Sequence, residues 1–316
     1  MRASQLLFYA ILLLFISCQQ VSSTTEEESQ KEIELKTGTI EHNGASIYYR
    51  SIGKGEPILV VHGGPGMDHS YFLPHLDELA DSYQLIYFDQ RAAGKSSFDL
   101  DSSQMSMEIM VEDMEAIRQH FALDKVNILA HSWGGLLAMW YAKSHPEKLK
   151  RLMLVNTIAA NKAYDAAAAE NLQKRRNEED VAAMQELMQS EAFKNQEEEA
   201  FLEVFKLNFT PSFYHKEYLD SLQLAFPDNY RERQGKLMYL MPDLQAYDLY
   251  DELAKIKAPT LLVHGEVDAT PLAAIEKIAE KIEGSQLDIF SECGHFPFIE
   301  SKAAFRKSID KFMHPQ

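Results

Sequence analysis

Cysteine is scarce in this 316-residue chain, which contains only Cys18 and Cys293. One pair of distant cysteines cannot form the disulfide framework of a small secreted domain. Basic residues are also in the minority, because 31 Lys and Arg face 48 Asp and Glu and leave a net charge of −17. A surface of that sign repels a phosphate backbone, so we expect no nucleic-acid partner.

The apolar run near the start of the chain is too short to cross a bilayer. Leu6 to Ile16 spans eleven residues, whereas a membrane-spanning helix needs about 20. Arg2 precedes this run and Ser17-Cys18 follows it, which is the order of a secretory signal. The stretch Phe15-Ile16-Ser17-Cys18 resembles the lipobox of bacterial lipoproteins, with Phe15 where leucine is usual. That resemblance implies cleavage before Cys18 and its lipidation.

We therefore expect residues 1–17 to be a signal peptide and 18–31 to be a solvated tether, rich in Ser, Thr and Glu. The protein would then be exported and anchored to a membrane of the cell envelope through Cys18. An ordinary signal peptide and an uncleaved anchor are the alternatives. Cys293 is left as a lone thiol, for which we expect a small buried position.

The remaining chain has the composition of a globular α/β protein, with 46% hydrophobic residues. Strand patterning at 33–41 and 45–51 flanks Asn43-Gly44, a strong signal for an antiparallel hairpin. Short apolar runs separated by helical patterns are typical of buried parallel strands. We expect such strands at 58–62, 85–88, 126–130, 152–155, 260–264 and 287–290. The helical patterns lie at 71–82, 107–121, 133–144, 272–282 and 303–312.

The alternation of strands and helices breaks once. Between Asn156 and Pro259, about a hundred residues show helical patterning and no convincing strand. This gap predicts a helical cap inserted over one edge of the sheet. We assign 157–242 to the cap, and 32–156 together with 243–316 to the core.

A candidate nucleophile stands where a buried strand ends. Ser132, in His131-Ser132-Trp133-Gly134-Gly135, follows the strand at 126–130 and opens a helix. A nucleophile elbow needs this strand-turn-helix context, in which a strained backbone presents the hydroxyl and small neighbours allow close packing. The alternative is a serine that only caps the helix.

Further motifs follow three other strands. His62-Gly63-Gly64-Pro65-Gly66 comes after the strand at 58–62, where a glycine-rich loop can turn an amide toward an oxyanion. Gly64 and Trp133 are the expected oxyanion donors. Asp268 and His295 follow the strands at 260–264 and 287–290, in the chain order serine, acid, histidine. His295 would take the proton from Ser132, and Asp268 would orient the imidazole.

Several nearby side chains receive other roles. Glu266 is a competing acid, but it follows its strand so closely that it is less suited to reach the histidine. For His62, His131 and His264 we expect packing or hydrogen-bonding roles. No pair of Cys or His residues has the usual spacing of zinc ligands, so we expect no metal site.

Together these motifs resemble the prolyl aminopeptidase, or proline iminopeptidase, family of α/β-hydrolases. The resemblance spans about residues 35–315 and is most specific in the HGGPG segment at 62–66 and in Asp89-Gln90-Arg91. It implies an α/β fold with an eight-stranded, mostly parallel sheet, helices on both faces and an inserted helical cap. It also implies a Ser132, Asp268 and His295 triad that releases N-terminal proline from peptides without a metal or organic cofactor.

Three positions depart from the family pattern. Ala92 stands where glycine commonly follows the DQR motif, and Ala130 where the elbow usually has glycine. Ala269 replaces a glutamate with which some members bind the substrate's ammonium group. The cap residues Glu199 and Glu203 are substitute candidates for that carboxylate, and Gly63 is a further candidate for substrate contact.

The departures keep other functions open. A carboxylesterase or lactonase acting on small acyl substrates is the alternative to a peptidase, because the same triad cleaves esters and amides. Epoxide hydrolases and dehalogenases are disfavoured, since they carry aspartate at the elbow. A cell-envelope binding protein that keeps the fold without turnover is the remaining hypothesis.

Overall fold

The computed structural model describes residues 34–195, 197–225, 227 and 229–315. The predicted signal peptide, the tether and Cys18 lie outside these residues and stay predictions. Within the described ranges, the helices are too short or too polar to span a membrane.

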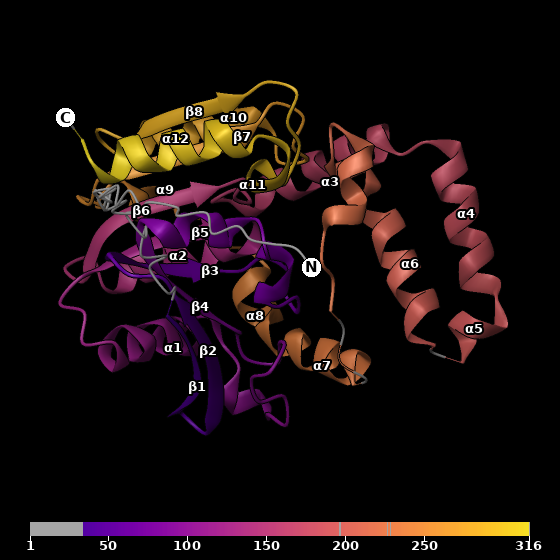
Figure 1. The fold of residues 1–316 in the computed structure, drawn as a ribbon, viewed down its shortest axis with the longest axis horizontal. Helices are drawn as coiled ribbons and strands as arrows, with labels where there is room; N and C mark the ends of the chain where they lie inside the picture. Colours follow the sequence, from indigo (N-terminus) through magenta and orange to yellow (C-terminus); the bar gives the residue numbers. More distant parts are fainter. Residues whose placement is uncertain (1–33, 196, 226, 228, 316) are drawn as a thin grey trace, which may run out of the picture. The chain divides into compact units, whose positions relative to one another are not determined.

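The centre of the fold is an eight-stranded sheet with the order β1-β2-β4-β3-β5-β6-β7-β8 in the described chain. The pairs β1–β2 and β2–β4 are antiparallel, and the other neighbours are parallel. In Figure 1 the labels run in this order from β8 to β1. The strands are β1 (Leu35–His42), β2 (Ala45–Ile52), β3 (Glu56–Val61), β4 (Tyr83–Phe88), β5 (Val126–His131), β6 (Leu149–Val155), β7 (Thr260–Gly265) and β8 (Gln286–Phe290).

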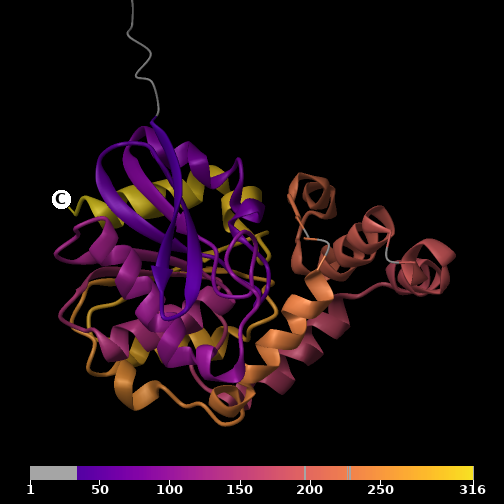
Figure 2. The same cartoon turned by 90° about the horizontal axis from the view of Figure 1, so that it is seen from below.

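The predicted hairpin forms at Asn43-Gly44. Both residues have positive φ, 45° and 73°, as a tight two-residue turn with right-handed strand twist requires. Figure 2 shows the paired β1 and β2 in indigo. The predicted mixed sheet, with an antiparallel start and a parallel remainder, is confirmed.

Two hydrophobic layers cover the sheet, one on each face. Alternate residues of β3 enter different layers: Leu59 and Val61 pack on one side, Ile58 and Val60 on the other. The first layer is closed by α1 (Met107–His120), α2 (Trp133–Ser144), α9 (Tyr250–Leu253) and α10 (Leu272–Lys281). The second is closed by α11 (Pro297–Glu300), α12 (Lys302–Met313) and two short 3₁₀ helices described next.

The predicted helix at 71–82 is wrong. The segment forms two 3₁₀ helices, His69–Phe72 and Leu76–Asp81, separated by Leu73-Pro74. Proline disfavours the helical region for the preceding residue, and Leu73 is extended, with ψ 147°. Tyr71, Phe72 and Leu76 of these two short helices are nevertheless buried in the second layer.

The long segment between β6 and β7 forms the helical insertion. Among its described residues, strand-like pairing is limited to one bridge between Asn161 and Asp248. Before α9, its described α-helices are α3 (Asp165–Arg175), α4 (Glu178–Gln189), α5 (Glu191–Lys194), α6 (Glu198–Phe209), α7 (Tyr230–Leu237) and α8 (Met241–Leu244).

Candidate active site

Ser132 occupies a strained turn between β5 and α2. Its φ of 56° and ψ of −124° are unusual for a residue with a Cβ atom. The turn is held because the Ser132 N–H donates to the Val155 carbonyl at 3.0 Å, and the Ser132 carbonyl accepts from the Gly135 N–H at 2.9 Å. Strain retained by neighbouring bonds in this way is typical of a functional site.

The two glycines after the elbow allow α2 to pass close to its neighbours. A Cβ atom on Gly134 would lie 2.5 Å from the Val61 carbonyl oxygen, and one on Gly135 would lie 2.1 Å from the Thr157 hydroxyl. No real side chain tolerates such distances without movement. The pair Gly134-Gly135 is therefore required by packing, whatever chemistry Ser132 performs.

Gly134→Ala is expected to destabilise the fold by about 1–3 kcal/mol, because the added methyl meets the backbone of β3. Urea unfolding would measure the change in free energy of unfolding. The control is Gly235→Ala in α7, where nothing lies within 4 Å of an added Cβ. That variant should gain roughly 0.5–1 kcal/mol from helix propensity, and equal stabilities of the two variants would contradict the packing argument.

Asp268 and His295 meet at the carboxyl ends of β7 and β8. The His295 Nδ1 lies 2.5 Å from the Asp268 Oδ2, and Asp268 is 6% exposed. The other carboxylate oxygen, Oδ1, accepts from the Thr270 N–H at 2.7 Å. Burial alone would raise the pKa of Asp268, but the charge and hydrogen bond of His295 outweigh burial and lower it. The carboxylate is thus ionised and fixes the orientation of the imidazole.

A buried asparagine that sequence reasoning missed also holds Asp268. Asn156, just after β6, donates from Nδ2 to the Asp268 Oδ2 at 2.7 Å and to the Gly294 carbonyl at 3.0 Å. It is fully buried and has a positive φ of 43°. Its place at the carboxyl end of a parallel strand, level with the other candidates, was the signal that could have found it.

The competing acid does not reach the histidine. Glu266 is exposed, and its carboxylate accepts from the Glu292 N–H at 3.3 Å. Cys293, two residues before His295, is buried, and burial raises the pKa of its thiol to about 12. That thiol therefore stays protonated and has the inert, buried position expected of it.

The histidine loop is bonded directly to the cap. The His295 N–H donates to the Ser212 carbonyl at 2.7 Å. The Glu300 carboxylate accepts from the Gly294 N–H at 2.8 Å and from the Tyr214 N–H at 2.7 Å. Burial raises the pKa of Glu300. Cap and core thus share the bonds that place the imidazole.

The backbone around the serine offers two free amides. The Gly63 N–H already donates to the Tyr71 hydroxyl at 2.6 Å. Within the described chain, no acceptor is bonded to the N–H of Gly64 or Trp133, and Gly64 has a φ of 130° that favours glycine. Free, preorganised N–H groups beside a nucleophile are what an oxyanion hole requires.

Ser132 and His295 open onto one small cavity of about 60 Å³. Its walls are apolar and aromatic, with one further histidine, and include no carboxylate among the described residues. They comprise Gly63, Gly64, Met67, Tyr71, His131, Ser132, Phe209, His295 and Phe296. In the described structure no hydrogen bond joins the Ser132 hydroxyl to His295. Catalytic hydrogen bonds are often long before substrate binds and tighten in the Michaelis complex.

The two cap glutamates proposed for substrate binding do not line this cavity. Glu199 and Glu203 are both exposed on α6, and Glu203 pairs with Lys206 at 3.3 Å. The same helix reaches the cavity through a different residue, Phe209 at its carboxyl end. In this arrangement α6 contributes an aromatic wall rather than a charge.

The DQR segment, residues 89–91, is hydrogen-bonded to the start of the glycine-rich loop at 62–66. The Gln90 side chain accepts from the Trp133 indole N–H at 2.9 Å and donates to the His62 carbonyl at 2.6 Å. Arg91 is fully buried and its guanidinium is paired with Asp113. Ala92 has a φ of 61°, in the left-handed region that favours glycine, which explains why glycine commonly stands there.

One group of side chains beside this segment has the spacing of metal ligands. Donor atoms of Asp68, His69 and Asp89 lie within 4.8 Å of one another. Asp89, however, is buried and accepts from the His69 Nδ1 at 2.7 Å, the His69 N–H at 3.1 Å and the Lys95 N–H at 2.8 Å. Protein N–H groups therefore already bond both carboxylate oxygens of Asp89. These bonds explain the close spacing of the three side chains as part of the hydrogen bonding around the DQR segment.

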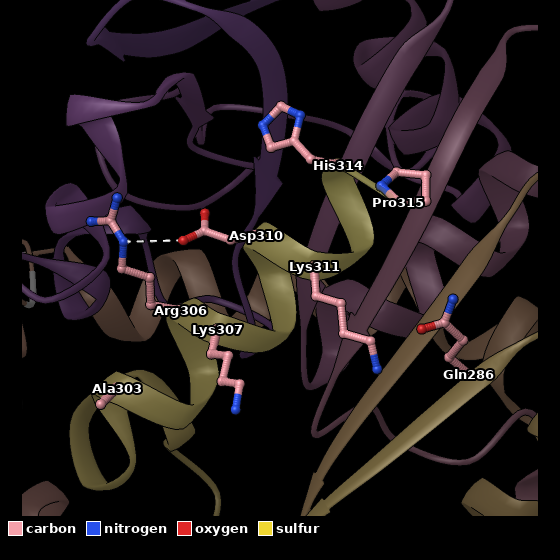
Figure 3. A pocket seen from close by; sticks show the side chains of 8 residues that line it. All are labelled: Gln286, Ala303, Arg306, Lys307, Asp310, Lys311, His314 and Pro315. Atoms are coloured by element: carbon pink, nitrogen blue, oxygen red, sulfur yellow. Dashed lines mark hydrogen bonds and ion pairs between the residues drawn. The ribbon is translucent and has the colours of Figure 1, made fainter.

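A second hollow lies against α12 and the start of β8 (Figure 3). It contains the Arg306–Asp310 ion pair together with the side chains of Lys307 and Lys311. None of its described lining residues is shared with the Ser132 cavity.

The fold and this site define the class of protein. Residues 56–302 match the family model for the alpha/beta hydrolase fold, and the chain belongs to that family. Among curated relatives, a proline iminopeptidase of Lactobacillus helveticus (strain DPC 4571) is 31% identical over 288 residues, covering 85% of this chain and 94% of the relative.

Solved structures share the fold at lower identity. The proline iminopeptidase of Mycobacterium smegmatis aligns with a TM-score of 0.64 and 19% identity, covering 88% of this chain and 98% of the other. Est816, described as an N-acyl homoserine lactone degrading enzyme, aligns with a TM-score of 0.63 and 24% identity, covering 87% and 100%. Both similarities concern the fold alone.

Proposed function

We propose that the protein is a serine hydrolase with Ser132 as nucleophile, His295 as general base and Asp268 as the orienting acid. The observation that carries the proposal is the hydrogen bond between the buried Asp268 and the half-buried His295, whose imidazole lines the same cavity as the strained serine. Three groups from three strand ends converge there, and packing alone gives no reason for that convergence.

The reaction follows from the geometry. The Ser132 oxygen attacks the carbonyl carbon of the substrate while His295 takes the hydroxyl proton. The oxyanion that forms accepts from the N–H groups of Gly64 and Trp133. His295 then gives the proton to the leaving amine or alcohol, which leaves an acyl-enzyme. Water attacks this ester with His295 again as the base, releases the acid and restores the serine.

For the substrate, we propose a peptide with an N-terminal proline. The similarity to the Lactobacillus proline iminopeptidase supports this choice. The cavity supports it as well, because Phe209, Phe296 and Met67 form a small apolar wall on the scale of a five-membered ring.

A second candidate, a carboxylesterase or lactonase, is favoured by one specific observation. The described walls of the cavity carry no carboxylate, whereas a buried ammonium group without a negative partner is costly. A neutral acyl substrate has no such need. A non-catalytic binding protein of the same fold is disfavoured, since binding gives no reason to keep a charged acid–histidine pair beside a strained serine.

The substrate class can be tested by comparing kcat/KM on proline arylamide, N-acetylproline arylamide and short acyl esters. An aminopeptidase should prefer the free amine at least about tenfold, because a pocket built for an ammonium group rejects the blocked substrate. Equal rates on the free and acetylated compounds would contradict the peptidase. Faster turnover of the acyl esters would then favour the second candidate.

A further inference from the structure

We propose that Tyr71 and His131 form a buried relay that positions the catalytic groups, a role that rests on the function proposed above. Neither residue would react with substrate. They would act through the loops that carry the oxyanion donor, the nucleophile and the base.

The relay is a chain of three hydrogen bonds. The Gly63 N–H donates to the Tyr71 hydroxyl at 2.6 Å, and that hydroxyl contacts the His131 Nδ1 at 2.8 Å. The opposite ring nitrogen of His131, Nε2, contacts the His295 carbonyl oxygen at 2.8 Å. The side chains of Tyr71 and His131 are both buried.

The geometry and the burial of the ring together fix the donors. A backbone N–H can only donate, so the Tyr71 oxygen accepts from Gly63, and a carbonyl oxygen can only accept, so His131 donates from Nε2 to His295. In a neutral ring with its proton on Nε2, Nδ1 can only accept, so the Tyr71 hydroxyl donates to it. Consistently, burial lowers the pKa of His131 far below its usual value, and the charge of His295 lowers it further.

The three bonds connect segments far apart in sequence. Gly63 precedes Gly64 in the oxyanion loop, His131 precedes the nucleophile Ser132, and the bonded carbonyl belongs to the base His295. Because the Gly63 N–H is engaged, residue 63 cannot rotate freely, and the next amide, that of Gly64, stays free for the oxyanion. A displacement of about 1 Å in such groups can lower a rate roughly 10²-fold.

Ring packing makes the relay testable without unfolding the protein. The Tyr71 ring lies 4.3 Å from Phe72 and 6.3 Å from Phe296 between centroids. A phenylalanine at 71 keeps these contacts and loses only the hydroxyl, which leaves the Gly63 N–H and the His131 Nδ1 without partners. Tyr141 offers a matched control, because it is also fully buried and its hydroxyl donates to a carboxylate, Glu115, at 2.9 Å.

For Tyr71→Phe, we expect kcat to fall roughly tenfold to a hundredfold with KM changed less than about threefold. Tyr141→Phe should keep kcat within about twofold, although it too loses a buried hydrogen bond. The rate of reaction with a fluorophosphonate should fall in parallel with kcat. A merely structural role for Tyr71 would lower the stability of both variants and spare kcat in both.

Two substitutions at His131 separate the ends of the relay. His131→Gln can place an amide N–H where Nε2 donates to the His295 carbonyl, whereas His131→Asn can place an oxygen only where Nδ1 accepts from Tyr71. Glutamine should therefore retain more kcat than asparagine. A wild type that does not react with the fluorophosphonate overturns the proposed function. If the wild type does react, but Tyr71→Phe has the same kcat and the same fluorophosphonate rate, the relay is overturned and the proposed function stands.

Discussion

Ser132→Ala is expected to abolish hydrolysis, with kcat lowered by roughly 10⁵- to 10⁶-fold. In the proposed mechanism the Ser132 oxygen forms the acyl-enzyme, so alanine at this position leaves no atom there to attack the substrate. Labelling with a fluorophosphonate should be lost together with turnover. Alanine is suitable because it has the same Cβ atom as serine, so it adds no new steric clash at the φ of 56° that residue 132 adopts.

The control is Ser144→Ala, at the other end of the same helix. Ser144 is exposed at the last position of α2, so its replacement should leave labelling and kcat/KM unchanged. If Ser132→Ala were labelled as fast as the wild type, the nucleophile would have to be another residue. Circular dichroism of both variants would show that the fold is retained.

The fold could be predicted closely wherever the signal is local. The helix predicted at 133–144 coincides with α2, which begins directly after the strand and the turn at Ser132. The prediction of one helix at 71–82 was wrong for an equally local reason, because Pro74 separates two short helices there. Apolar spacing shows which side chains are buried, and proline decides whether they can share one helix.

The site was predictable where motifs mark strand ends. Ser132, Asp268 and His295 each follow a buried strand, and parallel strands bring their carboxyl ends to one edge. Asn156 and Tyr71 carry no motif. Their roles depend on bonds to residues more than a hundred positions away, as from Asn156 to Asp268, or on a ring that crosses to another strand, as from Tyr71 to His131.

The substrate-binding residues of the cap are the least predictable part of the candidate site. Glu199 and Glu203 are predicted because an ammonium group needs a carboxylate, but the sequence does not show which side of a helix faces the cavity. The structure places both on the exposed side of α6, and its cavity residue is Phe209. Acidic runs are usually solvated surface.

Two side chains hold the glycine-rich loop at 62–66. Gln90 links the Trp133 indole to the His62 carbonyl, and Tyr71 holds the next amide, that of Gly63. Rigid donors cost no reorganisation when charge develops, which is how such sites stabilise a transition state. The specificity of the HGGPG and DQR motifs thus has a physical origin in one bonded unit.

Asp268→Asn is expected to lower kcat by roughly 10³- to 10⁴-fold while leaving the shape of the site intact. Both carboxylate oxygens accept N–H groups: Oδ2 from His295 and Asn156, Oδ1 from Thr270. An amide has one accepting oxygen, so in either orientation its NH₂ group faces a donor. With the NH₂ group toward His295, the imidazole is held in the tautomer that cannot take the serine proton.

The variant should also change the acid stability of the protein. The pKa of Asp268 is lowered in the folded state, so its charge stabilises the fold above the ordinary carboxyl pKa, and this contribution is lost as pH falls toward the folded value. Asparagine does not titrate and removes this pH-dependent part. Urea unfolding of wild type and variant from about pH 6, above the ordinary carboxyl pKa of about 4, down to about pH 2 would measure the difference.

Glu266→Gln is the matched control for the acid. It changes a carboxylate to an amide two residues earlier on the same loop, but Glu266 is exposed and bonded to the backbone of Glu292 rather than to His295. We therefore expect kcat within about twofold of wild type, as for surface substitutions away from a site. A large loss in Glu266→Gln with activity retained in Asp268→Asn would exchange the roles of the two acids. The paired measurement thus decides which carboxylate orients the histidine.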